Sequence, residues 1–338
     1  MKAKGSAPGK ALRKGPRKNP KTRPLDLGAV TTYPLAARVS KVSVKDFGRP
    51  YKRGSRFQVF AASLPKTLAA DQLRAVAHNI ERGRAKKRPL IWGMGAHILK
   101  VGLAPIIIDL MERGFITAIA LNGAGIVHDF ETAISGQTSE EVDAVLGSGQ
   151  FGMARETGEE INRAISQGVL EGLGLGASVG RYIMERRSTK FRDLSILAAA
   201  WRLGIPATVH VAMGTDIVHM HPSCDPGAVG RGSHFDFRIL AGEVARLGGG
   251  GVYLNIGSAV LLPEVFLKAV TLARNLGHEI SDFTTANFDF IQGYRPNTNV
   301  VNRPTKGVGR GYSITGHHEI MIPLLAAMLI DGDGRGRT

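Results

Sequence analysis

Residues 89–125 read PLIWGMGAHILKVGLAPIIIDLMERGFITAIALNGAG, and this stretch decides the fold. It contains an apolar run, a glycine-rich turn, a helical segment, and then a second apolar run with a glycine-rich turn of its own. Apolar runs without alternation are typical of strands that are buried on both faces of a sheet. Strands that alternate with helices of this length predict an α/β fold, with a parallel sheet that has helices on both faces.

The same alternation of apolar runs and helical segments extends through the rest of the chain. We predict strands near residues 89–93, 117–122, 206–213, 251–257 and 280–286. Helices are predicted before the first strand (69–87), within 151–186, and at the C-terminus (317–330) because of their apolar spacing. Residues 291–316, rich in glycine, proline and asparagine, are predicted to form a long loop.

Composition restricts the class of protein. The chain has 338 residues, of which 43 % are hydrophobic, so a sizeable core can form. Its single cysteine, Cys224, excludes an internal disulfide framework. Charges interrupt every apolar run well before the roughly 18 residues that a membrane span needs. No apolar stretch of a secretory signal follows the basic N-terminus, so we expect a cytoplasmic protein that does not enter a membrane.

The net charge of +16 is concentrated at the N-terminus. Residues 2–23 contain nine Lys and Arg and no acidic residue, which leaves +7 for the remainder of the chain. This composition predicts a disordered basic tail over residues 1–25, followed by a single domain over 26–338. The tail could contact nucleic acid or another polyanion, or serve only as a solubilising extension.

Glycine-rich turns end the first two predicted strands. The first ends at Gly93-Met94-Gly95 and lacks the third glycine of the dinucleotide fingerprint, and the second ends at Asn122-Gly123-Ala124-Gly125. Glycines at such a point let backbone N–H groups approach a phosphate, although tight turning without a ligand also requires them.

Polar residues follow the other strands, and ligands bind outside the carboxyl ends of parallel strands. Polar side chains that converge in this way at one edge of the sheet predict a binding site for a dinucleotide. Candidate cofactor contacts are Gly93, Gly95, Asn122, Gly123, Gly125, Gly257 and Ser258, and Asp216 and Asp289 are candidates for the ribose or a substrate amine.

Several histidines are also predicted to lie at the carboxyl ends of the strands. Six of the ten lie in or beside strand-end loops: His97, His128, His219, His221, His317 and His318. His219 and His221 would share one face of an extended segment and, with a neighbouring Asp216, Cys224 or Asp225, could bind zinc. The common zinc signatures are absent, so a zinc-dependent hydrolase remains an alternative.

Several segments of residues 89–330 resemble deoxyhypusine synthase. The glycine-rich stretch from Gly93 to Asp129 is similar to that family's first cofactor-binding segment. GTDIVHMHP (214–222) resembles its Gly-Asp run before a histidine, which would match Asp216 and His221. TTANFDF (284–290) and IMIPLLAAML (320–329) resemble a later strand and the C-terminal helix.

The resemblance implies a Rossmann-like, homotetrameric NAD enzyme with active sites shared between subunits. Such enzymes dehydrogenate spermidine and transfer its aminobutyl group through an imine on an enzyme lysine. Lys306 lies about two residues from the position of that lysine, and His128 stands where the family has a catalytic glutamate. The lost carboxylate indicates a less cationic substrate.

We therefore predict an NAD-dependent enzyme that oxidises an amine or amino acid to an imine, with or without transfer of the alkylamine group. Lys306 would be the imine-forming nucleophile if burial lowers its pKa, and is otherwise a solvated surface lysine. His128, His317 and His318 are candidates for proton transfer. Besides the zinc hydrolase, a nucleotide-binding regulator without catalytic activity remains an alternative.

Overall fold

The computed structural model describes residues 24–332. These residues belong to two compact units, one ending at Ser43 and the other beginning at Val44. In the first unit, residues 24–43 are exposed and contain the short 3-10 helix η1 (Leu35–Ala37). The basic segment 2–23 lies outside the described residues, so the tail boundary at residue 25 stays a prediction. Within 24–332, no helix combines the length and the apolar character that crossing a bilayer requires.

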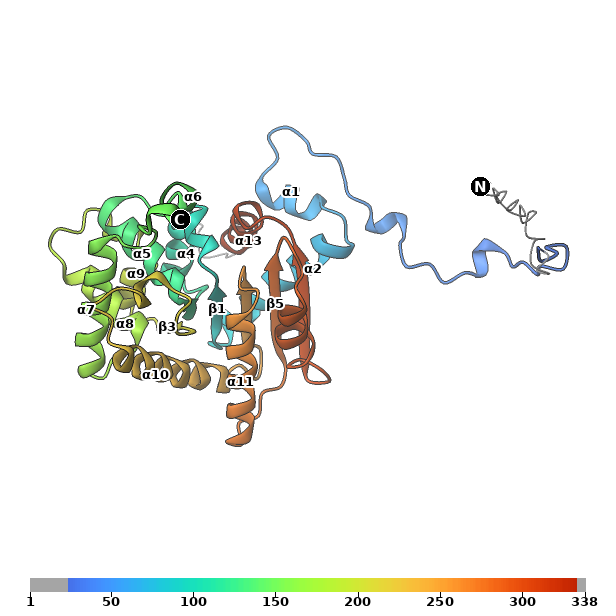
Figure 1. The fold of residues 1–338 in the computed structure, drawn as a ribbon. Helices are drawn as coiled ribbons and strands as arrows, with labels where there is room; N and C mark the ends of the chain where they lie inside the picture. The colour runs from blue at the N-terminus through green and yellow to red at the C-terminus, as the bar shows by residue number, and fades with distance from the viewer. Residues whose placement is uncertain (1–23, 333–338) are drawn as a thin grey trace, which may run out of the picture. The chain divides into compact units, whose positions relative to one another are not determined.

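The second unit contains a six-stranded sheet in which every pair of neighbouring strands is parallel (Figure 1). Its spatial order is β3-β2-β1-β4-β5-β6. The strands are β1 (Leu90–Met94), β2 (Ala118–Asn122), β3 (Ala207–His210), β4 (Val252–Ile256), β5 (Phe283–Asp289) and β6 (Gly309–Thr315). The predicted parallel sheet is confirmed, and each of the five predicted strands overlaps one of the first five observed.

The prediction of a loop over residues 291–316 was wrong. This segment contains a helical turn α12 (Tyr294–Pro296), the π-helix η6 (Asn297–Asn302) and the strand β6. β6 is only partly buried and carries glycine and arginine at its start, so it lacks an apolar run. Gly311 is needed there because a Cβ would lie 2.1 Å from the carbonyl oxygen of Val301 in η6.

Helices cover both faces of the sheet. On one face, Leu90, Trp92 and Met94 of β1 belong to a core that includes residues of α2, α4, α5, α9 and α13. On the other face, Ile91 and Tyr253 belong to a core with α10 and α11. Successive side chains of β1 thus point to opposite faces, and both faces are apolar because both are covered.

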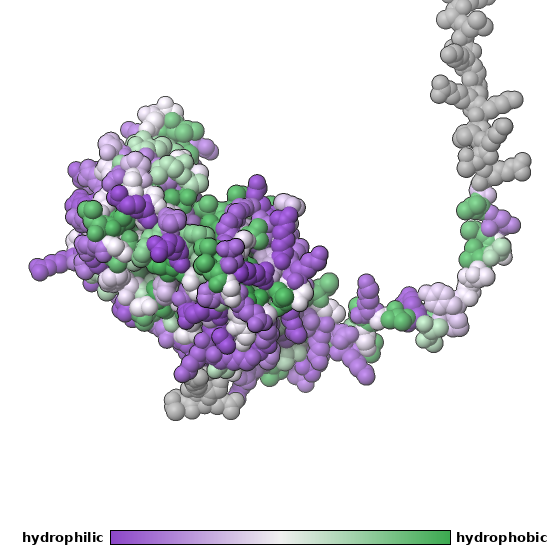
Figure 2. Space-filling model, turned by 90° about the horizontal axis from the view of Figure 1, so that it is seen from below, coloured by the Kyte–Doolittle hydropathy of each residue, from purple (hydrophilic) through white to green (hydrophobic). Residues whose placement is uncertain are grey.

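The helices have the following bounds: α1 (Phe57–Ser63), α2 (Leu68–Ala85), α3 (His97–Lys100), α4 (Ala104–Glu112), α5 (Gly123–Ser135), α6 (Val142–Val145), α7 (Arg155–Leu170), α8 (Leu175–Glu185), α9 (Ile196–Leu203), α10 (Pro226–Ala245), α11 (Leu261–Asn275) and α13 (His318–Gly332). Short 3-10 helices are η2 (Val44–Asp46), η3 (Leu146–Ser148), η4 (Arg192–Leu194) and η5 (Ile217–His219). Figure 2 shows one face of the molecule, on which hydrophilic residues predominate and hydrophobic residues appear in patches between them.

The strand order fixes where a ligand can bind. The chain builds β1, β2 and β3 toward one side and then returns to place β4 on the other side of β1. The loops that leave β1 and β4 lead to α4 and α11, which pack on opposite faces of the sheet. This topological switch point is where ligands bind in doubly wound sheets of this order.

Candidate functional site

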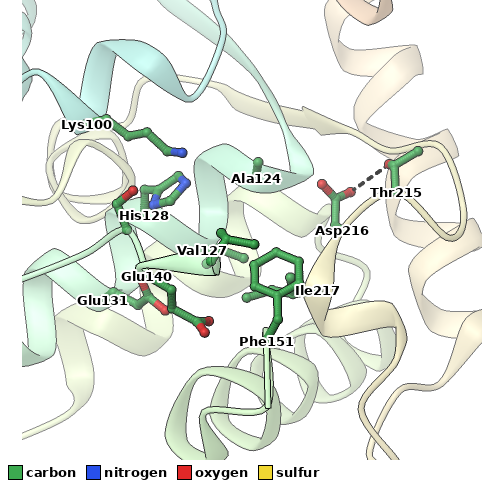
Figure 3. A pocket seen from close by; sticks show the side chains of 12 residues that line it. Lys100, Ala124, Val127, His128, Glu131, Glu140, Phe151, Thr215, Asp216 and Ile217 are labelled. Carbon is green, nitrogen blue, oxygen red and sulfur yellow. Dashed lines mark hydrogen bonds between the residues drawn. The ribbon is translucent and has the colours of Figure 1, made fainter. Parts of the chain in front are cut away.

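The carboxyl edge of the sheet carries a pocket beside β2 and β3. Its volume is about 220 Å³. Polar residues that line it are Lys100, His128, Glu131, Ser139, Glu140, Thr215 and Asp216, and apolar ones are Ala124, Val127, Val142, Phe151 and Ile217. In Figure 3, the Lys100 and His128 side chains lie close to each other, and the apolar side chains lie between His128 and Asp216.

A hydrogen-bond chain fixes the orientation of His128. The Thr138 hydroxyl donates to Glu131 Oε2 at 2.6 Å, and Thr138 Oγ1 lies 2.6 Å from His128 Nδ1. Because the hydroxyl proton is already used, Nδ1 must carry the proton that His128 shares with Thr138, which leaves Nε2 as an acceptor. Burial, and to a lesser extent the charge of Lys100, lowers the pKa of His128 to about 4. The imidazole is thus a neutral base at pH 7.

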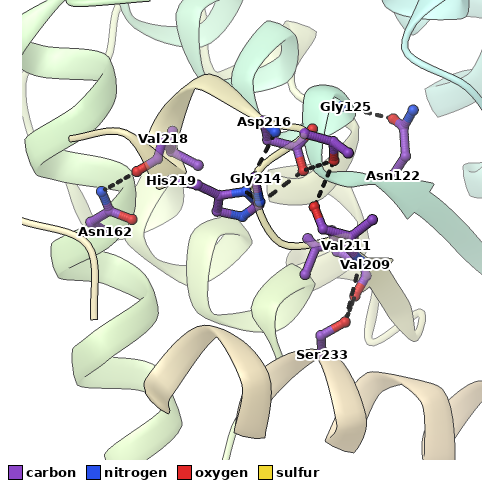
Figure 4. Close-up of polar contacts among 12 residues, drawn as sticks. Asn122, Gly125, Asn162, Val209, Val211, Gly214, Asp216, Val218, His219 and Ser233 are labelled. Atoms are coloured by element: carbon purple, nitrogen blue, oxygen red, sulfur yellow. Dashed lines mark hydrogen bonds and ion pairs between the residues drawn. The ribbon is translucent and has the colours of Figure 1, made fainter. Parts of the chain in front are cut away.

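Asp216 occupies the N-terminus of α5. A Cβ on Gly123 would lie 2.1 Å from Asp216 Oδ2, so the carboxylate fills the space that glycine leaves open. Burial raises the pKa of Asp216, and the charge of His219 opposes this shift. Asn122 Oδ1 accepts a hydrogen bond from the amide of Gly125 at 3.0 Å (Figure 4). Asn122 therefore caps α5 through the amide of Gly125, and Gly123 admits Asp216, while the phosphate contact of these residues stays a prediction.

The two histidines of the zinc alternative are both engaged elsewhere. His219 Nδ1 accepts from the amide of Gly214 at 3.1 Å, and its ring lies beside Asp216 (Figure 4). His221 Nδ1 lies 2.7 Å from the hydroxyl of Ser223. Among residues 24–332, no three side chains of His, Cys, Asp or Glu converge as a metal-binding group. The described geometry therefore offers no donor set for a zinc-dependent hydrolase.

Gly95, Gly257 and His318 meet at the switch point. The Gly95 amide donates to the Ile256 carbonyl at 2.8 Å, and a Cβ on Gly95 would lie 2.2 Å from the Gly257 oxygen. Gly257 has a φ of +66°, which favours glycine, and faces the ring of His318. Gly95 thus allows its backbone to pack against the backbone of Gly257, and Gly257 allows the His318 ring to pack against its own backbone.

His318 has one nitrogen without a partner. Its Nε2 lies 3.0 Å from the carbonyl oxygen of Phe288 and so donates to it. Nδ1 is then an acceptor, is buried, and has no hydrogen-bond partner among the described residues. The His97 ring lies edge-on at a centroid distance of 5.5 Å. A buried acceptor that has no protein partner is a group whose hydrogen bond a ligand or a water can supply.

The neighbouring strand ends carry further polar groups. Asn255 Nδ2 donates to Asn287 Oδ1 at 2.7 Å, while Asn255 Oδ1 is buried without a partner. Ser258 Oγ accepts the amide of Leu262 at the start of α11, and Asp289 accepts the amide of Phe290. Ser258 and Asp289 thus have structural partners at this edge.

Of three further predicted site residues, Lys306 lies away from these groups, whereas His317 directly precedes His318 and Gly93 pairs with Asn255 between β1 and β4. Lys306 is exposed in the turn that precedes β6, which places it at the amino edge of the sheet. The structure therefore does not bring Lys306 to His128 or His318. His317 is exposed and lies parallel to Phe290. Gly93 faces the hydroxyl of Tyr253, which lies 2.5 Å from the position of an added Cβ.

Sequence reasoning missed Lys100, Glu131, Glu140, Phe151 and Asn255. Glu131 could have been found, because it follows His128 by three residues on one helix and so shares its face. Glu140 and Phe151 lie in irregular segments whose path no local pattern indicates.

These features define a doubly wound α/β protein of the Rossmann type, with polar groups at the carboxyl edge. No family model matches the chain, and no curated protein matches it in sequence. Solved structures with the same fold include an LOR/SDH protein from Methanococcus maripaludis S2, at 16 % identity and a TM-score of 0.50, covering 79 % of this chain and 71 % of that one.

A protein described as a deoxyhypusine synthase, from Entamoeba histolytica, is similar at 10 % identity and a TM-score of 0.50, with 84 % and 96 % of the chains covered. AgrE in complex with ornithine and NAD+ is similar at 15 % identity and a TM-score of 0.50. That match covers 78 % of this chain but only 33 % of AgrE. These likenesses confirm that the chain has the deoxyhypusine synthase-like fold.

Proposed function

We propose that the chain binds NAD across the carboxyl edge of the sheet and uses it to oxidise an amine or amino acid to an imine. The observation that carries this proposal is the switch point between β1 and β4, where the buried His318 has an unpartnered acceptor. AgrE, of which the part that matches this fold makes up 33 %, binds ornithine and NAD+. An assembly of several copies, expected from the sequence resemblance, is part of the proposal.

The residues at the switch point fit a nicotinamide cofactor. His318 Nδ1 and Asn255 Oδ1 are buried acceptors without partners. An N–H of a carboxamide complements an acceptor of this kind. When bound, NAD would supply the capacity to accept hydride from the carbon that bears nitrogen.

The pocket beside β2 and β3 fits the substrate. Lys100 can pair with the carboxylate of an amino acid, while Glu131, Glu140 and Asp216 favour an amine. Oxidation at the C–N carbon starts from the neutral amine and gives an iminium, and His128 Nε2 can accept the proton that the iminium loses as it becomes the imine. Val127, Phe151 and Ile217 exclude water from the same space. His128, rather than the exposed Lys306, is thus the proposed proton acceptor.

Binding of NAD is the first test. We expect NAD to raise the melting temperature of the wild-type chain, and His318→Gln to weaken NAD binding by roughly tenfold, or about 1.4 kcal/mol, in isothermal titration. His278→Gln removes an exposed histidine elsewhere and should leave the affinity unchanged. Wild-type protein that binds no NAD in either assay would disprove the proposal.

The pH dependence of turnover tests His128. Because its pKa is lowered to about 4, the group is neutral above that pH and becomes protonated as the pH falls through it. We expect kcat/KM for an amino-acid substrate to decline toward pH 4 through this group. His128→Asn should lower kcat by roughly a hundredfold and remove that acid limb while NAD affinity is retained. An unchanged pH profile in the variant would exclude His128 as the base.

A further inference from the structure

A second cavity lies at the opposite, amino-terminal edge of the sheet. Its volume is about 290 Å³, and its lining consists of Arg84, Lys87, Arg88, Pro89, Gly114, Thr117 and Arg246. Pro89 and Thr117 directly precede β1 and β2, and Arg246 precedes β4 by a short glycine run. The cavity therefore spans the amino ends of three neighbouring strands. Five residues of β1, at about 3.3 Å each, separate it from the carboxyl edge by roughly 16 Å.

The charge in this cavity is almost entirely positive. Four cationic side chains line it, and no carboxylate does. Arg246 pairs with Glu243, whereas Lys87 and Arg88 make no ion pair within residues 24–332. Four positive charges that line one cavity repel one another, and a bound anion would reduce that repulsion.

Arg84 is held in place rather than free to turn away. Its Nη2 donates to the carbonyl of Arg113 at 2.6 Å, and its guanidinium lies 4.1 Å from the centroid of the Phe115 ring. A positioned guanidinium presents its N–H fork with less loss of entropy on binding than a mobile one.

A four-glycine loop, residues 248–251, lies against Arg88 of the cavity and against Lys86, which is not among the residues that line it. Gly249 and Gly250 have φ values of +78° and +122°, a region that disfavours other residues. An added Cβ at Gly249 would lie 3.1 Å from Arg88 Nη2, and one at Gly250 would lie 3.3 Å from Cδ of Lys86. The loop thus allows both side chains to lie against its backbone.

We propose that this cationic cavity binds a small phosphorylated molecule through its phosphate groups. Guanidinium forks match phosphate oxygens, and the two cations without ion pairs suit a ligand of charge near −2. A volume of about 290 Å³ matches a small ligand, whereas nucleic acid binds along a cationic stripe. This site is separate from the proposed NAD site, because it lies at the other edge of the sheet.

The test uses inorganic pyrophosphate as the probe and isothermal titration of the full chain. We expect wild-type protein to bind pyrophosphate, and Lys87→Gln/Arg88→Gln to bind it at least roughly tenfold more weakly. The matched control, Arg187→Gln/Lys190→Gln, removes the same charge from two other exposed residues and should keep wild-type affinity. Melting curves establish that both variants are folded, and both should retain NAD affinity.

Three results would overturn the proposal. The first is no binding of pyrophosphate to wild-type protein. The second is an equal loss in both double variants, which would show a general effect of net charge. The third is a single-stranded DNA oligonucleotide that binds through Lys87 and Arg88 more tightly than pyrophosphate does, which would instead indicate a nucleic-acid surface.

Discussion

Asp129→Ala is expected to lower the free energy of unfolding by about 3–5 kcal/mol at pH 7. The Asp129 carboxylate is completely buried and accepts from the Ser195 hydroxyl at 2.5 Å and the Ile196 and Leu197 amides at 2.7 and 3.1 Å. It therefore binds the N-terminus of α9, and its removal would leave these donors unpaired in the core. Chemical denaturation followed by circular dichroism measures the loss.

The pH dependence of this effect has a definite sign. Burial raises the pKa of Asp129 to about 6, against the opposing hydrogen bonds of Ser195 and the α9 amides. A carboxyl with a raised pKa stabilises the fold at low pH, and that contribution is lost as the pH rises through about 6. The deficit of the variant should therefore be larger at pH 5 than at pH 7.

The control is Asp193→Ala, close in sequence to α9 but exposed. It should change stability by no more than about 0.5 kcal/mol. Equal stability of the two variants would mean that the buried cap contributes nothing measurable.

Gly95→Ala should destabilise the fold by about 2–3 kcal/mol and also abolish NAD binding. The added Cβ would lie 2.2 Å from the oxygen and 2.8 Å from the carbon of Gly257. Both are backbone atoms, so the loop after β4 would have to move, and His318 packs against that loop. Thermal melts and NAD titration measure the two effects.

Gly230→Ala is the matched control for Gly95→Ala. Gly230 lies within α10, where an added Cβ would meet nothing within 4 Å. Alanine in a helix is favoured over glycine by roughly 0.5–1 kcal/mol, so this variant should be as stable as the wild type or more so. If Gly95→Ala melts like Gly230→Ala and still binds NAD, the close approach at the switch point is not a constraint on the site.

The apolar runs of the sequence predicted most of the sheet, because strands buried on both faces must be apolar throughout. β6 was missed since it is only partly buried, and Gly309 and Gly311 in it resemble loop residues. That omission also misplaced Lys306, which the turn before β6 leaves at the amino edge.

The site was predicted only in part, for a physical reason. Glycine permits close approach equally to a phosphate and to a neighbouring backbone, so the glycines of the turns could not show which fills the space. In the structure, Gly123 faces Asp216, Gly95 faces Gly257, and Gly257 faces His318. These contacts join distant segments, and no local pattern specifies them.

The central strand pairing also has a kinetic consequence. The sheet's halves, β1 to β3 and β4 to β6, are hydrogen-bonded to each other only through β1 and β4, where Ile91 lies opposite Tyr253. This register closes a loop of about 160 residues, and contacts this far apart in sequence raise the contact order of a fold and slow its folding. During synthesis, the segment that contains β1 to β3 emerges from the ribosome well before β4 has been synthesised. The switch point between β1 and β4 can therefore form only late in folding, and until then β1 presents an unpaired edge that can aggregate.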